Sequence, residues 1–122
     1  MFSLDIPPDW SAAREELRGA MTRAGWKPGL VGDAELALLE LFVNAWRHGG
    51  SPAPLVVITA IDGVLRVSVS DPSPVLPVQR EGSGLHAVSG RGLRLVRSLT
   101  HRFGSDPRRS GKSVWFELDA AA

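Results

Sequence analysis

Residues 36–50, with the sequence LALLELFVNAWRHGG, decide how the rest of the chain folds. Apolar side chains occupy most positions of this stretch, which predicts a buried helix that ends at the final glycine pair. Glu40 and Asn44 interrupt the apolar pattern one turn apart and therefore share a helix face, and His48 follows one turn later. Burial of an unpaired carboxylate or amide costs free energy. We therefore expect this polar stripe to face either other polar groups of the protein or a ligand.

The flanking sequence predicts further helices and several short strands. Helices are expected from Asp9 or Ser11 to about Ala24, from a cap at Asp33 through the stretch above, and from residue 91 to about 99. Strands are expected at residues 2–6, 55–61, 64–70, 100–104 and 114–118. The dipeptide Asp62-Gly63 predicts a tight hairpin between the second and third of these strands. Residues 75–89 lack periodicity and predict a long loop, which in a compact domain is usually functional or disordered.

This order of elements predicts a single domain over residues 1–122 of the α+β class. Two helices precede a hairpin and one follows it. The expected architecture is a two-layer sandwich, with a mixed β-sheet that carries helices on one face.

Composition excludes several classes of protein. The chain has 122 residues, a net charge of +1 and no cysteine, so disulfides and thiolate metal sites are excluded. The first residues lack the basic segment and apolar run of a signal peptide, and no apolar stretch is long enough to span a bilayer. We therefore expect a cytoplasmic protein with no membrane partner.

Charge is less even than the total suggests. Between residues 80 and 112 the basic residues are Arg80, Arg91, Arg94, Arg97, Arg102, Arg108, Arg109 and Lys112, against Glu81 and Asp106. Such a run could contact phosphates or an acidic partner, but it is more often a solvated face. Weak, salt-sensitive DNA binding is the most that it predicts, and no direct nucleic-acid partner is expected.

Two segments carry oxygen ligands suited to a nucleotide. Asn44 offers a neutral oxygen of the kind that Mg²⁺ accepts beside waters and phosphates, and Glu40 could accept a proton from a hydroxyl group. The structural alternative is a carboxylate paired with Arg47 or with a backbone amide. Asp71, at the end of a strand, could accept a hydrogen bond from an exocyclic amine. Aspartate before proline is, however, also ordinary turn chemistry.

Two more segments could surround the same ligand. Gly90 and Gly92 would allow the backbone close to phosphates, with Arg91 beside them, although glycine also begins ordinary helices. Ser113, at the start of the last strand, could support Asp71 through a water molecule, although a turn before a strand explains it equally well.

Taken together, the four segments resemble one family. ELFVNAWRHG is similar to the N box of the GHKL nucleotide-binding fold, which gyrase, histidine kinases and mismatch-repair proteins share. VSDPSP resembles its first glycine box, GRGLRLV the second, and GKSVWFEL the final strand motif. The resemblance covers nearly the whole chain and is greatest to small bacterial anti-sigma factors that are serine kinases.

The resemblance implies a set of roles. Asn44 would coordinate Mg²⁺ between the ATP phosphates, and Glu40 would be the catalytic base toward a substrate serine. ATP-binding residues would be Asn44, Asp71, Gly90, Arg91, Gly92, Leu93 and Ser113, with Asp71 reading the adenine amine and Ser113 behind it. The implied partners are a sigma factor and an anti-anti-sigma protein, and the family also implies a homodimer.

The sequence departs from the family pattern in two places. The first glycine box usually continues from aspartate with glycines, whereas this chain has prolines at 72 and 74. The final motif often has threonine where Lys112 or Ser113 stands. A non-catalytic nucleotide-binding module that acts on its partner by binding alone is therefore the alternative, with the arginines of the first helix as its partner surface. A sensor histidine kinase fragment is disfavoured because no helix pair with a phosphoacceptor histidine precedes residue 2, and His48, His86 and His101 lie in or after the expected ATP site.

Overall fold

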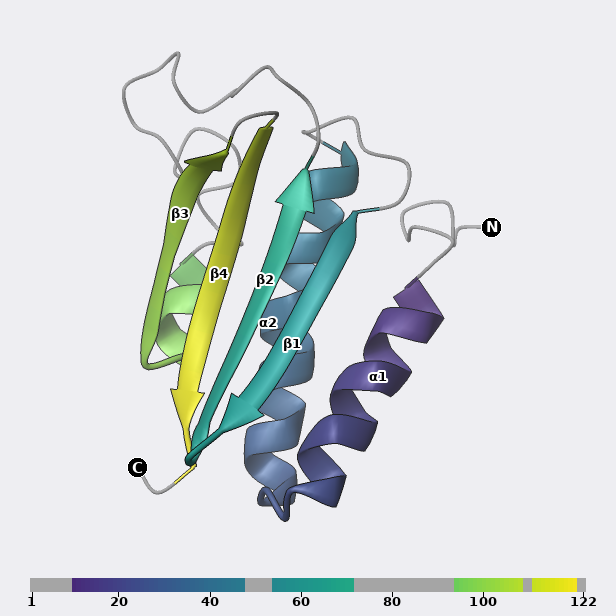
Figure 1. Cartoon of the computed structure of the whole chain (residues 1–122), viewed down its shortest axis with the longest axis vertical. Coiled ribbons are helices and arrows are strands. Elements are labelled where there is room, and N and C mark those ends of the chain that lie inside the picture. Colours follow the sequence, from purple (N-terminus) through teal and green to yellow (C-terminus); the bar gives the residue numbers. More distant parts are fainter. Residues whose placement is uncertain (1–9, 48–53, 72–93, 109–110, 121–122) are drawn as a thin grey trace.

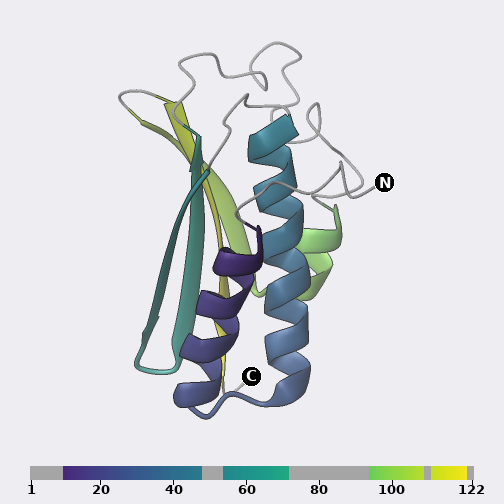
Figure 2. The same cartoon turned by 90° about the vertical axis from the view of Figure 1, so that its right-hand side faces the viewer.

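A computed structural model describes residues 10–47, 54–71, 94–108 and 111–120. Helices α1 (Trp10–Arg23) and α2 (Pro28–Arg47) cover one face of a four-stranded sheet, as Figures 1 and 2 show. A shorter helical stretch at residues 94–99 lies on the same side of the sheet (Figure 2). The two-layer α+β architecture with helices on one face is confirmed.

The sheet consists of β1 (Leu55–Ile61), β2 (Val64–Asp71), β3 (Arg102–Arg108) and β4 (Gly111–Asp119), in the spatial order β1-β2-β4-β3. Every pairing among these four strands is antiparallel, whereas the sequence predicts a mixed sheet. The antiparallel pattern follows from two hairpins, β1–β2 and β3–β4, that join through β2 and β4. The strand predicted at residues 2–6 lies outside the described residues.

The helix α1 ends in a Schellman motif. The amide of Trp26 donates to the carbonyl of Met21 at 3.0 Å, and the amide of Gly25 donates to the carbonyl of Thr22 at 3.0 Å. Gly25 has φ +81°, which suits the left-handed position of this motif. Trp26 and Met21 are both buried, and their contact is the apolar one that accompanies such an end. The predicted stop at this glycine is confirmed.

The start of α2 differs from the prediction. The sequence predicts a cap at Asp33, but the helix begins at Pro28, and the amides of Leu30 and Val31 donate to the carbonyl of Lys27. Proline suits the first helical position because its ring fixes φ and its missing N–H has no intrahelical partner there. The Gly49-Gly50 stop lies outside the described residues.

The hairpin between β1 and β2 is confirmed in detail. Ile61 pairs with Val64, and Asp62 and Gly63 between them have φ values of 52° and 78°. Two positive φ angles define the type I′ turn, which matches the natural twist of the strands.

Strands β3 and β4 are longer than predicted. The sequence predicts that the first ends at Gly104, before a polar turn rich in arginine, glycine and serine, but β3 continues to Arg108. Proline has no backbone N–H to donate to a neighbouring strand. Because β3 is an edge strand, it can accommodate Pro107 without losing a hydrogen bond to a further strand. Pairing over this extra length also moves the start of β4 back to Gly111.

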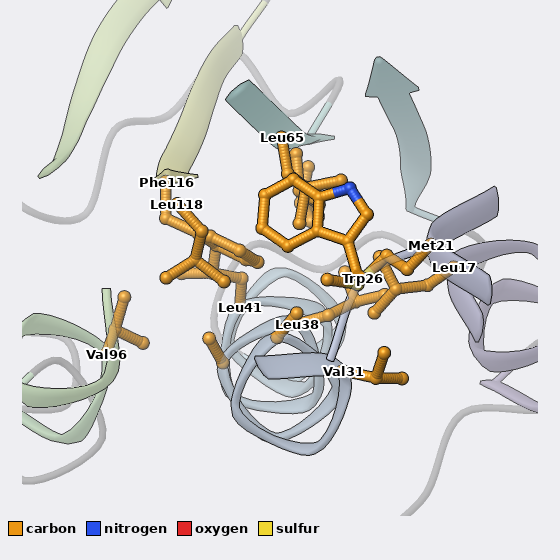
Figure 3. Packing of buried hydrophobic residues seen from close by; sticks show 14 of the residues in the cluster. Leu17, Met21, Trp26, Val31, Leu38, Leu41, Leu65, Val96, Phe116 and Leu118 are labelled. Carbon is orange, nitrogen blue, oxygen red and sulfur yellow. The ribbon is translucent and has the colours of Figure 1, made fainter. Parts of the chain in front are cut away.

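The core lies between the sheet and the helices. Its strand residues alternate along β2 (Leu65, Val67, Val69) and β4 (Phe116, Leu118), and register pairs Leu65 with Leu118 and Val67 with Phe116. The helical side is supplied by α1, by α2 and by Val96, and Figure 3 shows these side chains converging on one cluster. The buried α2 residues are Val31, Ala34, Ala37, Leu38, Leu41, Phe42 and Ala45.

The opposite face of the sheet carries an ion-pair network. Arg102 donates to Glu117 at 2.6 Å and to Asp119, while Arg66 donates to Glu117 at 2.9 Å and lies 4.3 Å above the ring of Trp115. Hydrogen bonds from Arg102 and then Arg66 lower the pKa of Glu117, and those from Arg102 lower the pKa of Asp119. Arg102, one member of the basic run, is therefore paired with acids on a solvated face.

Alanine at Gly25 and at Gly32 should change the free energy of unfolding in opposite directions. Gly25→Ala is expected to destabilise by about 1 kcal/mol, because φ +81° strains a residue with a Cβ atom. Gly32 lies inside α2 with open space around its Cβ position, so Gly32→Ala is expected to stabilise by about 0.5–1 kcal/mol. Urea unfolding measures both. Changes of the same sign would contradict this account of the two helix ends.

Candidate functional site

Three chain segments with candidate site residues meet at one end of the molecule. The C-terminal half of α2, the end of β2 and the start of β4 lie at the same end of the two layers (Figure 1). Helix α2 packs directly on β2 and β4. The fold therefore brings to one end of the molecule the segments that carry Glu40, Asn44, Asp71 and residues 111–113, which are far apart in the sequence.

Glu40 and Asn44 lie at the flank of the packed face of α2. Leu41 and Ala45, each the next residue along the helix, are buried, whereas Glu40 and Asn44 are partly exposed. The sequence predicts full burial, and the correction has a simple cause: the apolar face of α2 is broad but does not surround the helix. Partial exposure removes most of the cost of leaving these groups without a protein partner.

The Glu40 carboxylate has no ion pair or hydrogen bond with any residue that the structure describes, and the same holds for the side-chain amide of Asn44. The structural alternative, in which Glu40 pairs with a backbone amide, is not seen among these residues. The alternative pair with Arg47 involves a side chain outside the described part. An unengaged carboxylate and an amide, one turn apart and open to solvent, can both receive a ligand.

Strand register determines which residue of β4 lies opposite Asp71. Asp71 pairs with Lys112, and Ser113 pairs with Ser70. Side chains alternate along a strand, so Ser113 lies on the opposite face of the sheet from Phe116, while Lys112 shares the face of Phe116. Ser113 is thus the strand neighbour of the residue opposite Asp71, and its support of Asp71 through a water molecule stays a prediction.

Lys112 is the residue that sequence reasoning missed. It is 9% exposed, an unusual degree of burial for lysine. The signal was present in the sequence, because Lys112 lies two and four residues before the apolar positions Val114 and Phe116. The period of two along β4 would have placed it on the helix-facing side.

Several predicted site residues cannot be placed. Gly90, Arg91, Gly92 and Leu93, together with the predicted loop at residues 75–89, lie outside the described residues, as does His48. Asp71 is placed by its backbone alone.

The donor set fits magnesium rather than a metal held by the protein alone. No group of three or more histidine, cysteine, aspartate or glutamate side chains occurs within the described ranges that could hold a metal ion. Asn44 supplies one neutral oxygen that is open to solvent, and Mg²⁺ commonly keeps waters and substrate phosphates as its other ligands. Among the described helices, none is long and apolar enough to cross a membrane.

A comparison with protein families identifies the family of this chain. The model of the histidine kinase-like ATPase domain matches residues 7–118. The chain belongs to this family. No curated protein matches the chain. Family membership confirms the GHKL-type resemblance and gives this ATPase domain an ATP-binding regulatory function.

Asparagine at Asp71 should weaken ATP binding by tenfold or more. The carboxylate would accept a hydrogen bond from the adenine amine, and a bond to a charged acceptor contributes about 1.5–3 kcal/mol, while tenfold corresponds to about 1.4 kcal/mol. Tryptophan fluorescence during ATP titration is a direct readout because Trp46 lies two residues from Asn44. Asp62→Asn, in the turn at the other end of β2, is the matched control. Equal affinities for the two variants would remove Asp71 from the site.

Proposed function

We propose that this ATPase domain is a protein serine kinase that acts as an anti-sigma factor. It would use Mg-ATP to phosphorylate a serine of an anti-anti-sigma protein, and it would also bind a sigma factor. The observation that carries the proposal is the partly exposed carboxylate of Glu40, which has no partner among the described residues and lies one turn before Asn44 in an ATP-binding family. The order of sequence motifs supports the subtype, since it resembles the small bacterial anti-sigma kinases.

The proposed reaction needs few groups from the protein. The serine oxygen attacks the γ-phosphorus of ATP, the bond to the β,γ-bridging oxygen breaks, and ADP leaves. Glu40 accepts the serine proton, Asp71 orients the adenine, and Asn44 offers its oxygen to the metal. Bound Mg²⁺ would neutralise charge on the phosphates. Positioning and charge neutralisation supply most of the rate enhancement in phosphoryl transfer, so a small domain suffices.

The position of His101 argues against this histidine as the phosphate acceptor. His101 lies beside the end of β4, where its Nδ1 accepts a hydrogen bond from the amide of Asp119 at 3.0 Å. Asp119 and Gly111 are opposite ends of one strand, and the candidate site is at the Gly111 end (Figure 1). His101 is thus remote from the phosphates of an ATP molecule bound at that site.

A binding module without catalysis is the competing function. The arginines suggested as its partner surface are partly engaged within the protein, since Arg14 and Arg18 both donate to Glu35 of α2. Each retains about half of its side-chain surface exposed, so a partner could still contact them. The kinase proposal is preferred because it gives Glu40 a role.

Glutamine at Glu40 should abolish phosphate transfer while leaving ATP binding nearly unchanged. A positioned general base contributes about 10²–10⁴-fold to a rate, and the amide cannot accept the serine proton. Radiolabelled ATP with the cognate anti-anti-sigma protein measures phosphoserine, and Glu15→Gln on the exposed side of α1 is the matched control. Transfer by Glu40→Gln at the rate of the unmodified protein would contradict the kinase proposal. Sigma-factor capture without any phosphoserine would favour the binding module.

Alanine at Asn44, the only asparagine in the chain, should remove the magnesium dependence of ATP binding. The unmodified protein is expected to bind ATP more tightly with Mg²⁺ than with a chelator, because the Asn44 oxygen completes the metal's ligands. In Asn44→Ala the two affinities should converge. Leu36→Ala, two turns earlier on the same helix, is expected to keep the difference. A magnesium effect of unchanged size in Asn44→Ala would exclude this ligand.

A further inference from the structure

Lys112 is a buried lysine that lies opposite Asp71, the residue proposed to bind the adenine base. It is 9% exposed, and by alternation it shares the helix-facing side of β4 with Val114 and Phe116. Burying a charge is costly unless the charge is engaged, and Lys112 is indeed not a free cation. An ammonium group carries three N–H donors, so an interaction within the protein does not exhaust it.

The residues opposite Lys112 on the two adjacent strands show which charged residue lies next to it. β4 lies between β2 and β3, and Lys112 is opposite Asp71 on one side and Pro107 on the other. Directly opposite residues of antiparallel strands are close neighbours on one face of the sheet. Pro107 offers no polar side chain, so Asp71 is the single charged residue opposite Lys112 in this row. The row thus combines one hydrogen-bond acceptor with one donor.

Adenine presents the complementary pair. Its Watson–Crick edge carries a donor, the 6-amino group, directly beside an acceptor, the ring nitrogen N1. We propose that Lys112 is a base-reading residue of the ATP site, which donates a hydrogen bond to N1 while Asp71 accepts one from the amine. The inference rests on the adenine-binding role of Asp71 in the proposed function and is independent of phosphate transfer.

A hydrogen bond from Lys112 to N1 predicts a ligand preference that the burial of Lys112 alone does not predict. A lysine that only stabilises the strand would be indifferent to the atom at position 1 of the base. A lysine that donates to N1 would discriminate ATP from 1-deaza-ATP, in which a C–H group replaces that nitrogen. Loss of that acceptor would leave one N–H group of the ammonium desolvated and without its hydrogen bond to the base, which is a strong basis for rejecting a ligand.

The test compares ATP and 1-deaza-ATP on the full chain and on Lys112→Met by calorimetric or fluorescence titration. The unmodified protein is expected to bind 1-deaza-ATP about tenfold or more weakly than ATP. In Lys112→Met the two ligands should bind with nearly equal affinity. Lys27→Met is the matched control, because Lys27 is the only other lysine and is exposed at the far end of α2. It should retain the full discrimination.

The other outcomes separate this inference from the proposed function. Equal binding of the two ligands by the unmodified protein would overturn the N1 contact, whatever the variants do. If Lys112→Met discriminated ATP from 1-deaza-ATP as strongly as the unmodified protein, another group would contact N1. If Lys112→Met bound ATP more tightly than the unmodified protein, Lys112 would hinder base binding. Either result would contradict the proposal. Lys112→Leu replaces the methionine variant if circular dichroism shows that the latter is unfolded. Absence of any ATP binding would overturn both proposals, whereas ATP binding without phosphoserine would overturn only the kinase.

Discussion

The packing of the apolar face of α2 on β2 and β4 is the constraint on which the rest of this structure depends. Leu38 and Leu41 are almost completely buried in the core cluster, and each such side chain contributes roughly 1.5–3 kcal/mol by leaving water. This packing fixes the rotation of the helix about its axis. Turning α2 by one residue, about 100°, would exchange an apolar side chain for Glu40 at the core. The hydrophobic core therefore determines that Glu40 and Asn44 stand at its flank, open to a ligand.

The same core fixes the register of the strands and, through it, the second half of the site. A slip of one residue between β2 and β4 would bring Ser113, in place of Lys112, opposite Asp71. It would also turn Phe116 and Leu118 away from the helices, because side chains alternate with a period of two. Both residues are buried in the observed register. The position of Lys112 opposite Asp71 is thus a consequence of the packing of Phe116 and Leu118 further along the same strand.

Local patterns in the sequence predicted the elements whose signals are local. The hairpin at Asp62-Gly63 and the helix end at Gly25 both followed from residues that tolerate positive φ. Predictions failed where tertiary context decided the outcome. Pro107 is tolerated because β3 is at the edge, a position that no local pattern reveals. The burial of Glu40 was overestimated because periodicity gives an apolar face but not the width of the surface that covers it. The motif match did not single out Lys112, because it fixes residue types and leaves the cross-strand partner of Asp71 open.

Lys112 also shows why stability and function need not favour the same residue at one position. A buried charge that is engaged in the folded protein contributes little net stability, since desolvation offsets most of the attraction, and an apolar residue of similar volume is often neutral or stabilising. Val114 and Phe116, on the same face of β4, already supply apolar packing. Methionine at 112 would therefore be tolerated by the core while changing what the site can read. The same separation applies to Glu40 and Asn44, whose polar groups have no partner in the described structure and add nothing to its core. A binding site is typically built in this way: its functional side chains are not needed for folding, and the packed residues around them hold them in position.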